Sequence, residues 1–457
     1  MKKILIIGGS DAGISAGLRA REVDPSIDVA MVVADRFPNY SICGLPFYIS
    51  GETPDRRLLA HRSADELREK DIRLLLEHWA MAINPANQSV MIRTPEEDTL
   101  SLEYDELIIA TGAVSIRPDI PGMDLPGVFL LRWMGDGIIL KDYLDQEKPG
   151  SAVVIGGGYI GLEMADSFTR RGMRVTVVEY ADTVLTTVDP ELGIQVRDNL
   201  ERHGVQVATG TPVSAVERIG ERLLVMGAQD FSMETDIVLV TAGARPNVTL
   251  AAAAGVDIGG FGAIRVNSRM ETGVPHIFAA GDCVQTWHRV LKRYGYMPLG
   301  TTAHKQGRVA GENAAGGEAV FQGSIGTQVV KIFDLVAART GLKDAEAKTA
   351  GFDPLTVGCE TWDHKVYYPG AGRLHIRMTG DRATGRLLGA QILGQYGSEI
   401  SKRIDILAAA IFNEMNMDAI GGLDLSYTPP LSSPWDPVQA AAQEWSQRNR
   451  QRGKRPL

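Results

Sequence analysis

Cysteine is scarce in this chain, which has only three in 457 residues: Cys43, Cys283 and Cys359. They form no Cys-x-x-Cys pair and no spacing typical of metal ligands. Neither a disulfide framework nor a zinc site is therefore expected, and we predict no metal centre. Unpaired cysteines favour the reducing cytoplasm as the compartment.

Long hydrophobic runs and an excess of positive charge are also missing. No apolar stretch approaches the roughly 20 residues that cross a bilayer, so no membrane span is expected. The lysines and following apolar residues of Met1–Ile7 resemble the start of a secretory signal, but Gly8 and Gly9 end the apolar run, which favours a buried strand. The net charge of −9 argues against nucleic acid as a partner.

Glycine is abundant, with 50 residues, and one glycine-rich pattern occurs twice. In the second copy Gly156, Gly158 and Gly161 fill all three positions of Gly-x-Gly-x-x-Gly after the short apolar run Val153–Ile155. A second apolar run ends in Glu179. Such a turn lets backbone N–H groups at a helix start face a pyrophosphate, and the acid can bond ribose hydroxyls. This pattern predicts a dinucleotide site.

The first copy is less regular. Gly8 and Gly13 hold the outer positions, but Ser10 stands where the middle glycine belongs, and the acid Asp35 follows its strand instead of ending it. Taken alone, this copy fits a plain strand-to-helix connection equally well. Downstream apolar runs that break at Ala110–Gly112, at Gly243 and at Gly281–Asp282 support a second cofactor site.

With these segments, essentially the whole chain resembles the flavoproteins of the pyridine nucleotide-disulfide oxidoreductase superfamily. The resemblance implies an α/β fold with two Rossmann-like dinucleotide-binding domains, for FAD and for NAD(P)H, and a C-terminal α/β dimerisation domain. The implied limits are 1–114 with 244–322 for FAD, 115–243 for NAD(P)H and 323–445 for dimerisation. Residues 446–457 are rich in arginine and lack apolar periodicity, so we expect a solvated basic tail there. The residues expected to contact a cofactor are Gly8, Gly9, Ser10, Asp11, Ala12, Gly13, Asp35, Ser41, Ala110, Thr111, Gly112, Gly281, Asp282, Gly156, Gly158, Tyr159, Ile160, Gly161, Glu179 and Gly243.

Cys43 is the candidate redox centre. Its Cys-Gly-Leu-Pro run resembles the single-cysteine branch of the superfamily, which contains coenzyme A disulfide reductases, NADH oxidases, NADH peroxidase and persulfide reductases. A lone cysteine can hold electrons as a mixed disulfide, a persulfide or a sulfenic acid. A helix start after Gly44 is expected to lower the thiol pKa. The alternative for Cys43, and the preferred interpretation for Cys283 and Cys359, is a small apolar core residue.

Three tyrosines complete the candidate catalytic set. Tyr427 begins a Tyr-Thr-Pro-Pro run similar to the segment that reaches the partner's flavin across the family's dimer, where the tyrosine acts as an acid toward the leaving thiol. Tyr367 and Tyr368 match a second tyrosine segment, and a pair of ordinary strand aromatics is as good an explanation. The resemblance thus implies a homodimer with a shared active site.

The departures from the family pattern concern the substrate. Asp11 stands where NADH oxidases and peroxidases place a histidine, which weakens peroxidase chemistry. Ile42 and His304 replace two asparagines of coenzyme A reductases, so coenzyme A is a doubtful substrate.

The sequence therefore predicts an FAD enzyme that takes electrons from NADH, with NADPH possible, through Cys43 to a small disulfide or persulfide. The alternatives are an NADH oxidase that reduces O2, a reductase of a small electron-transfer protein, and a sensor flavoprotein without turnover.

Overall fold

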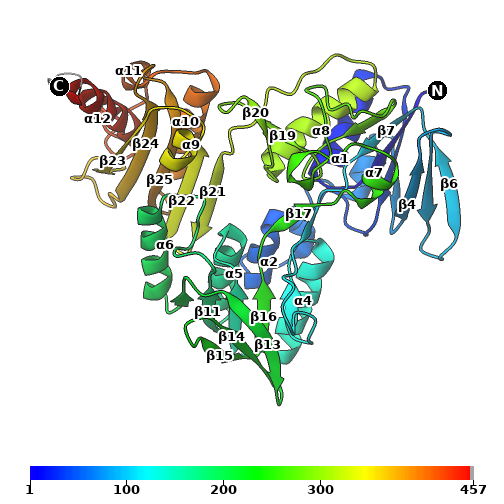
Figure 1. The fold of residues 1–457 in the computed structure, drawn as a ribbon, viewed down its shortest axis with the longest axis horizontal. Coiled ribbons are helices and arrows are strands. Elements are labelled where there is room, and N and C mark those ends of the chain that lie inside the picture. Colours follow the sequence, from blue (N-terminus) through cyan, green and yellow to red (C-terminus); the bar gives the residue numbers. More distant parts are fainter. Residues whose placement is uncertain (453–457) are drawn as a thin grey trace.

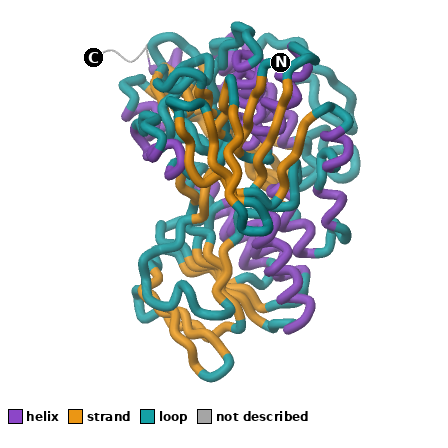
Figure 2. Tube along the Cα trace, turned by 90° about the vertical axis from the view of Figure 1, so that its right-hand side faces the viewer, coloured by secondary structure: helices purple, strands orange, loops and turns teal. Residues whose placement is uncertain are grey.

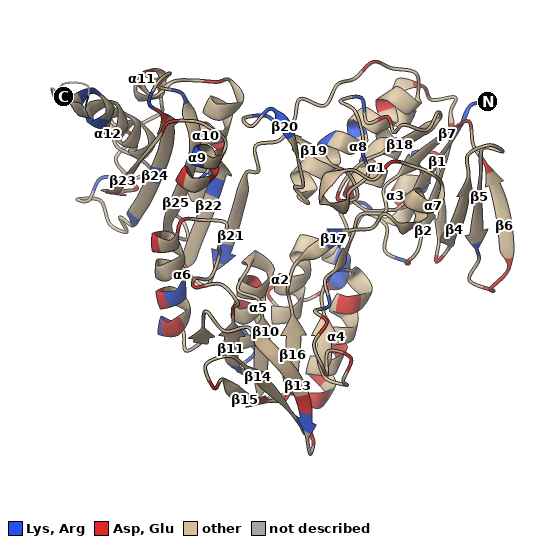
Figure 3. Ribbon diagram, in the orientation of Figure 1, with Lys and Arg blue, Asp and Glu red and all other residues tan. Residues whose placement is uncertain are grey.

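The structure, a computed structural model, describes residues 1–452. Three five-stranded sheets, each with its own helices, form the centres of three lobes (Figure 1). Figure 2, turned by 90°, shows the strands gathered into sheets with helices packed beside them. Charged residues of both signs are spread over all three lobes (Figure 3). Within residues 1–452, no helix combines the length and the apolar character that a membrane crossing requires.

The first lobe is built on a five-stranded parallel sheet in the order β18-β7-β1-β2-β3. Its central strand β1 is buried on both faces, as expected of an apolar run between helices. The chain leaves this sheet after β7 and returns with β18, so residues far apart in sequence form one layer. The strands and helices of this lobe are β1 (Lys3–Ile7), α1 (Asp11–Val23), β2 (Asp28–Val33), the short 3₁₀ turns Ile42–Gly44, Arg56–Leu59 and Gly260–Gly262, α2 (Leu45–Ser50), α3 (Ala64–Arg68), β3 (Ile72–Leu76), the antiparallel β4 (Trp79–Asn84), β5 (Ser89–Arg93) and β6 (Thr99–Glu103), β7 (Glu106–Ile109), α7 (Thr249–Ala253), β18 (Ile277–Ala279), β19 (Thr286–His288), β20 (Arg293–Gly295) and α8 (Gly300–Ala314).

The second lobe repeats this plan, with a parallel sheet in the order β12-β11-β10-β16-β9. The antiparallel pair β8 and β17 carries the chain into this lobe and out of it. The elements are β8 (Ala113–Ser115), β9 (Val128–Leu130), α4 (Met134–Glu147), β10 (Ser151–Ile155), α5 (Tyr159–Arg170), β11 (Arg174–Val178), α6 (Pro190–Arg202), β12 (Gln206–Ala208), the antiparallel β13 (Val213–Ile219), β14 (Arg222–Gly227) and β15 (Ser232–Thr235), β16 (Ile237–Val240) and β17 (Ala244–Pro246).

The third lobe has an antiparallel sheet in the order β21-β22-β25-β24-β23, with helices α10 and α12 packed on it. Its elements are β21 (Gln328–Ile332), β22 (Leu335–Gly341), α9 (Asp344–Thr349), β23 (Pro354–Trp362), β24 (Arg373–Asp381), β25 (Leu387–Gln395), α10 (Ile400–Phe412), α11 (Met417–Gly421) and α12 (Pro437–Arg452).

The prediction that a solvated basic tail begins at residue 446 is wrong in its starting point. Residue 446 lies inside α12, which continues to Arg452. Trp445 and Ser446 are buried, and the Trp445 indole Nε1–H donates to the carbonyl of Leu355 at 2.7 Å. Packing of Trp445 against β23 anchors α12, which continues into the segment that we expected, from its charge alone, to be a solvated tail. The end of the predicted tail, residues 453–457, lies outside the described residues.

Candidate active site

The first glycine-rich turn opens into a cavity of about 780 Å³. This cavity lies beyond the carboxyl ends of β1, β2 and β7, where parallel α/β sheets bind their ligands. Gly8 has φ +117°, and a Cβ there would lie 2.1 Å from the carbonyl oxygen of Ala110, so only glycine fits. The candidate residues that line the cavity are Gly8, Gly9, Ser10, Asp11, Ala12, Asp35, Cys43, Ala110, Thr111, Gly112, Tyr159, Ile160, Gly281 and Asp282.

Two other candidates from the first lobe lie behind this wall. Gly13 is buried under the turn, where a Cβ would lie 1.9 Å from the carbonyl oxygen of Gly8. Ser41 donates its backbone N–H to the carbonyl of Leu59 and shapes the segment before Cys43. Both residues support the backbone that faces the cavity.

The second glycine-rich turn joins β10 to α5. Gly156 has φ +111°, and Gly158 precedes the first turn of α5. Glu179 follows β11 and accepts the N–H of Gly157 at 2.6 Å and that of Ala181 at 2.8 Å, so its carboxylate also holds the turn. Gly161 packs against the carbonyl oxygen of Gly156, and Gly243, with φ +103°, follows the neighbouring strand β16.

Cys43 lies in the 3₁₀ turn that precedes α2, with its side chain exposed to the cavity. Although the side chain is accessible from the cavity, the surrounding walls displace much of the water near the thiol, and this desolvation is the main cause that raises its pKa. The charges of Asp11 and Glu163 raise the pKa further, while Arg132 acts in the opposite direction. The expectation that a helix start lowers this pKa is therefore wrong for the polypeptide itself. One short turn and the six-residue helix α2 do not outweigh the loss of water and two facing carboxylates.

Charged groups that the sequence analysis did not single out surround the thiol. Arg132 pairs with Asp282 at 2.5 Å, and the Tyr296 hydroxyl donates to the Asp282 carbonyl at 2.9 Å. Glu163 lies one helical turn after Tyr159 and also lines the cavity. Burial raises the pKa of Glu163 to about 8, although nearby Lys331 lowers it, so this carboxyl holds its proton at neutral pH.

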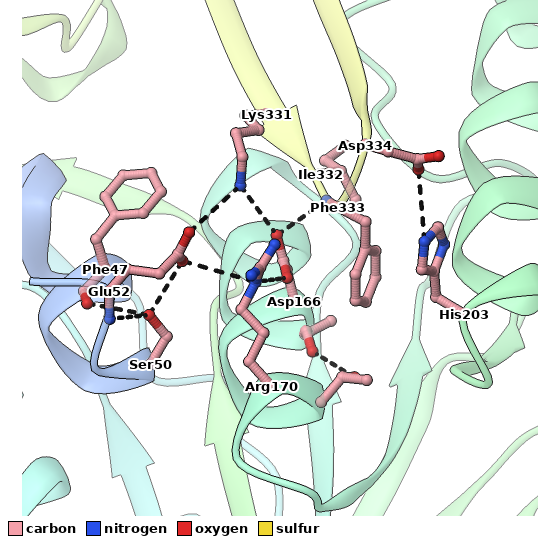
Figure 4. A network of polar contacts seen from close by, with 12 residues as sticks. Phe47, Ser50, Glu52, Asp166, Arg170, His203, Lys331, Ile332, Phe333 and Asp334 are labelled. Carbon is pink, nitrogen blue, oxygen red and sulfur yellow. Dashed lines mark hydrogen bonds and ion pairs between the residues drawn. The ribbon is translucent and has the colours of Figure 1, made fainter. Parts of the chain in front are cut away.

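An ionic network joins the segment after α2 to α5 and β21, and so ties the three lobes together (Figure 4). The Lys331 ammonium of β21 lies 3.6 Å from Asp166 of α5 and 3.8 Å from Glu52, which follows α2. Asp166 also accepts the side-chain Nε–H of Arg170 at 2.6 Å and the backbone N–H of Phe333 at 2.9 Å. The network holds α2, α5 and the β21–β22 hairpin in one arrangement around the cavity.

The three candidate tyrosines lie elsewhere, on two adjacent loops of the third lobe. Tyr367 and Tyr368 precede β24, and Tyr427 precedes α12. The backbone N–H of Lys365 donates to the carbonyl of Pro429 at 3.2 Å, which joins the two loops. All three side chains are exposed, between 44% and 71%, and none lines the cavity of its own chain. The structure of one chain therefore brings these tyrosines to each other and not to Cys43.

The other two cysteines lie away from this cavity wall. Cys283 is buried, with its thiol 3.3 Å from the carbonyl of Ala280, and Cys359 is half-buried in β23. Burial raises the pKa of each thiol to about 11. Both are poor nucleophiles at neutral pH.

Comparison with known proteins decides the family. A model described as pyridine nucleotide-disulphide oxidoreductase matches residues 2–307, and the model of that family's dimerisation domain matches residues 327–437. The chain belongs to the pyridine nucleotide-disulphide oxidoreductase family. The resemblance inferred from the glycine turns and the α/β fold class are thereby confirmed, and the chain carries the dimerisation domain of the family.

Members of this family align with the chain over nearly its whole length. A "NAD(P)H sulfur oxidoreductase (CoA-dependent)" of Pyrococcus furiosus is 35% identical over 96% of this chain and 97% of its own. An "NADH oxidase" of Methanocaldococcus jannaschii is 32% identical over 97% and 98%. The solved structure of a NAD-dependent persulfide reductase from A. fulgidus is 36% identical, with a TM-score of 0.94 over 99% of this chain and 84% of that one.

Proposed function

We propose that the protein is an FAD-dependent NAD(P)H oxidoreductase that passes electrons through Cys43 to a low-molecular-weight disulfide or persulfide. One observation carries this proposal. The first glycine-rich turn, the Cys43 side chain and residues of α5 from the second lobe line a single cavity. A nucleotide cofactor, a redox sulfur and an electron donor can therefore meet there.

The residues of the first lobe fit FAD. Gly8 and Gly9 line the cavity just before the N-terminus of α1, which would favour the negative charge of a pyrophosphate bound there. Asp35 uses one carboxylate oxygen for the N–H of Phe37 at 2.8 Å, which leaves the other for a ribose hydroxyl. Asp282 is available to the flavin's polyol chain. When bound there, FAD would supply the two-electron chemistry that links hydride from NADH to reduction of an oxidised sulfur.

The second lobe is the proposed NADH site. Gly156, Gly158 and Gly161 form the pyrophosphate turn, and Tyr159 and Ile160 link it to the cavity. Glu179 would accept hydrogen bonds from the adenosine ribose and repel a 2′-phosphate. We therefore propose NADH as the preferred coenzyme.

Cys43 supplies the sulfur chemistry. Because the cysteine is unpaired, its oxidised form is a mixed disulfide or a persulfide with a small thiol, and two electrons return it to thiolate. Arg132 favours that thiolate through its charge. The released thiol needs a proton, and in a homodimer the proposed donor is Tyr427 of the partner subunit. The three unpaired cysteines support the reducing cytoplasm as the proposed compartment.

The test is the Cys43→Ser variant, with Cys359→Ser as a matched control. NADH should still bleach the flavin absorbance of both variants, but disulfide- and persulfide-dependent NADH oxidation should disappear only in Cys43→Ser. Full activity of Cys43→Ser with these acceptors would contradict the proposal.

Reduction of O2 is the second candidate function, and the relative named NADH oxidase favours it. An anaerobic assay with sulfur acceptors and an aerobic assay without them separate the two activities. NADH oxidation that requires only O2, at a rate above that with any sulfur acceptor, would favour the oxidase.

A further inference from the structure

Asp11 and His304 form an ion pair that the sequence did not suggest. Asp11 begins α1, and His304 lies in the first turns of α8, 293 positions further along the chain. The imidazole Nε2 lies 3.3 Å from the Asp11 carboxylate, and Nδ1 lies 2.7 Å from the Ser15 hydroxyl. Both ring nitrogens therefore have partners on α1, which fixes the orientation of the ring.

The packing of α1 on α8 provides the space for this pair (Figure 1). A Cβ at Gly300 would lie 2.7 Å from the Asp11 carboxylate, and one at Gly307 would lie 2.2 Å from the carbonyl oxygen of Ala12. Glycine at these positions lets the helices approach closely, so the carboxylate sits beside the first turn of α8. The close packing of the helix backbones brings Asp11 and His304 together, and the Ser15 hydroxyl holds the other side of the imidazole ring.

Asp11 faces Cys43 from the wall of the same cavity. After burial, its charge is the largest influence that raises the pKa of the Cys43 thiol. Hydrogen bonding to Asp11 in turn raises the pKa of His304. The other groups that face His304 are the Ser15 hydroxyl of α1, Lys305 of its own helix and Arg62 before α3, and the two cations act against the Asp11 effect.

We propose that Asp11 and His304 make the reactivity of the Cys43 thiol depend on pH, with His304 as a positioning residue that compensates the Asp11 charge. Below the His304 pKa, the imidazolium neutralises Asp11, and the thiolate meets less repulsion. Above it, Asp11 faces the thiolate uncompensated. The inference rests on the proposed function only in taking Cys43 as the reacting thiol.

The test measures alkylation of Cys43 by iodoacetamide in the reduced holoenzyme, read by mass spectrometry, from about pH 6 to about pH 9. Near the lower limit, Cys43 of the His304→Asn variant should be alkylated about three- to tenfold more slowly than Cys43 of wild type. A change of up to one unit in the thiol pKa changes the thiolate fraction by that factor. The two rates should converge near the upper limit. Cys43 of His304→Lys, which keeps its charge throughout, should be alkylated about as fast as wild type near the lower limit and faster than wild type near the upper limit.

The matched control is His276→Asn, since His276 also pairs with a carboxylate, that of Glu106 at 3.4 Å, but neither residue lines the cavity. Near the upper pH limit, Cys43 of the Asp11→Asn variant should be alkylated faster than Cys43 of wild type. Adding His304→Asn to this variant should not change the alkylation rate further. This second variant tests the proposal if His304→Asn fails to bind flavin or to fold.

A His304→Asn profile that superimposes on wild type, or a His304 effect that persists without Asp11, would overturn the proposal. Alkylation reports the thiolate whether or not turnover uses it. Failure of this inference is therefore distinguishable from failure of the proposed function, which the Cys43→Ser activity assay decides.

Discussion

Glu179 is expected to decide the choice between NADH and NADPH. Its carboxylate follows β11 and is held by the N–H groups of Gly157 and Ala181, at 2.6 Å and 2.8 Å. These two bonds fix its charge at the turn proposed to hold the coenzyme. We predict that wild type prefers NADH and that Glu179→Gln removes most of this preference while keeping the shape of the side chain.

The magnitude follows from charge. A carboxylate and a 2′-phosphate of charge about −2, roughly 4 Å apart, repel by about 2 kcal/mol in water, which corresponds to about thirtyfold in kcat/KM. The glutamine amide cannot accept both N–H groups, so the turn also loses a charged hydrogen bond of about 1.5–3 kcal/mol. That loss should raise KM for both coenzymes alike. The ratio of kcat/KM for NADPH to that for NADH should therefore rise about thirtyfold, although both absolute values fall.

Steady-state kinetics with each coenzyme, at low ionic strength and with a saturating sulfur acceptor, measures this ratio. Glu201→Gln on α6 is the matched control, because Glu201 is exposed and only weakly paired with Arg197 at 3.9 Å. A wild-type preference for NADPH, or a ratio that Glu179→Gln leaves unchanged, would refute the reasoning.

Three further predictions concern the shared site, the helix contact and pH. Tyr427→Phe should slow disulfide turnover by about 10²–10⁴-fold, as expected for a lost general acid. Mixing Tyr427→Phe subunits with Cys43→Ser subunits should restore activity. No recovery after confirmed subunit exchange would make Tyr427 an interface residue only. Gly311→Ala should lower the free energy of unfolding by about 1–3 kcal/mol, because its Cβ would lie 2.1 Å from the carbonyl oxygen of Ala16. Gly135→Ala in α4, whose Cβ would meet open space, is the control. An equal Tm for both variants would contradict the argument. Burial raises the pKa of Glu163 from 4.5 to about 8, so the unfolded chain releases this proton first and stability falls as pH rises through that window. Glu163→Gln lacks this penalty, and calorimetry should show a larger gain in Tm near the upper end of the window than near the lower end; an equal gain at both ends would argue that Glu163 is ionised in the folded protein.

The two nucleotide turns could be predicted from the sequence because their geometry is local. A buried strand, a glycine with positive φ and a helix start lie within about ten residues of one another, and no distant contact is needed to recognise them. Asp35 and Glu179 could be found for the same reason, since each follows a strand of the expected length. Most of the predicted FAD residues accordingly line one cavity.

The charges around Cys43 could not be predicted in this way. Arg132 lies in the loop before α4 and Glu163 lies on α5, both far from Cys43 in the sequence, and His304 drew attention only as a replaced asparagine. The expected low pKa of Cys43 was wrong because it considered one local helix start and omitted the facing carboxylates. The predicted basic tail likewise omitted the contact between Trp445 and β23.

The sequence by itself thus determined where the chain turns and which strands are buried, because these depend on neighbouring residues and their conformational limits. The tertiary structure alone decided the pairing of Asp11 with His304, the proton on Glu163 and the separation of the tyrosines from Cys43 within one chain. Electrostatic effects sum over all groups within several ångströms, whatever their position in the sequence. Only folding brings those groups together.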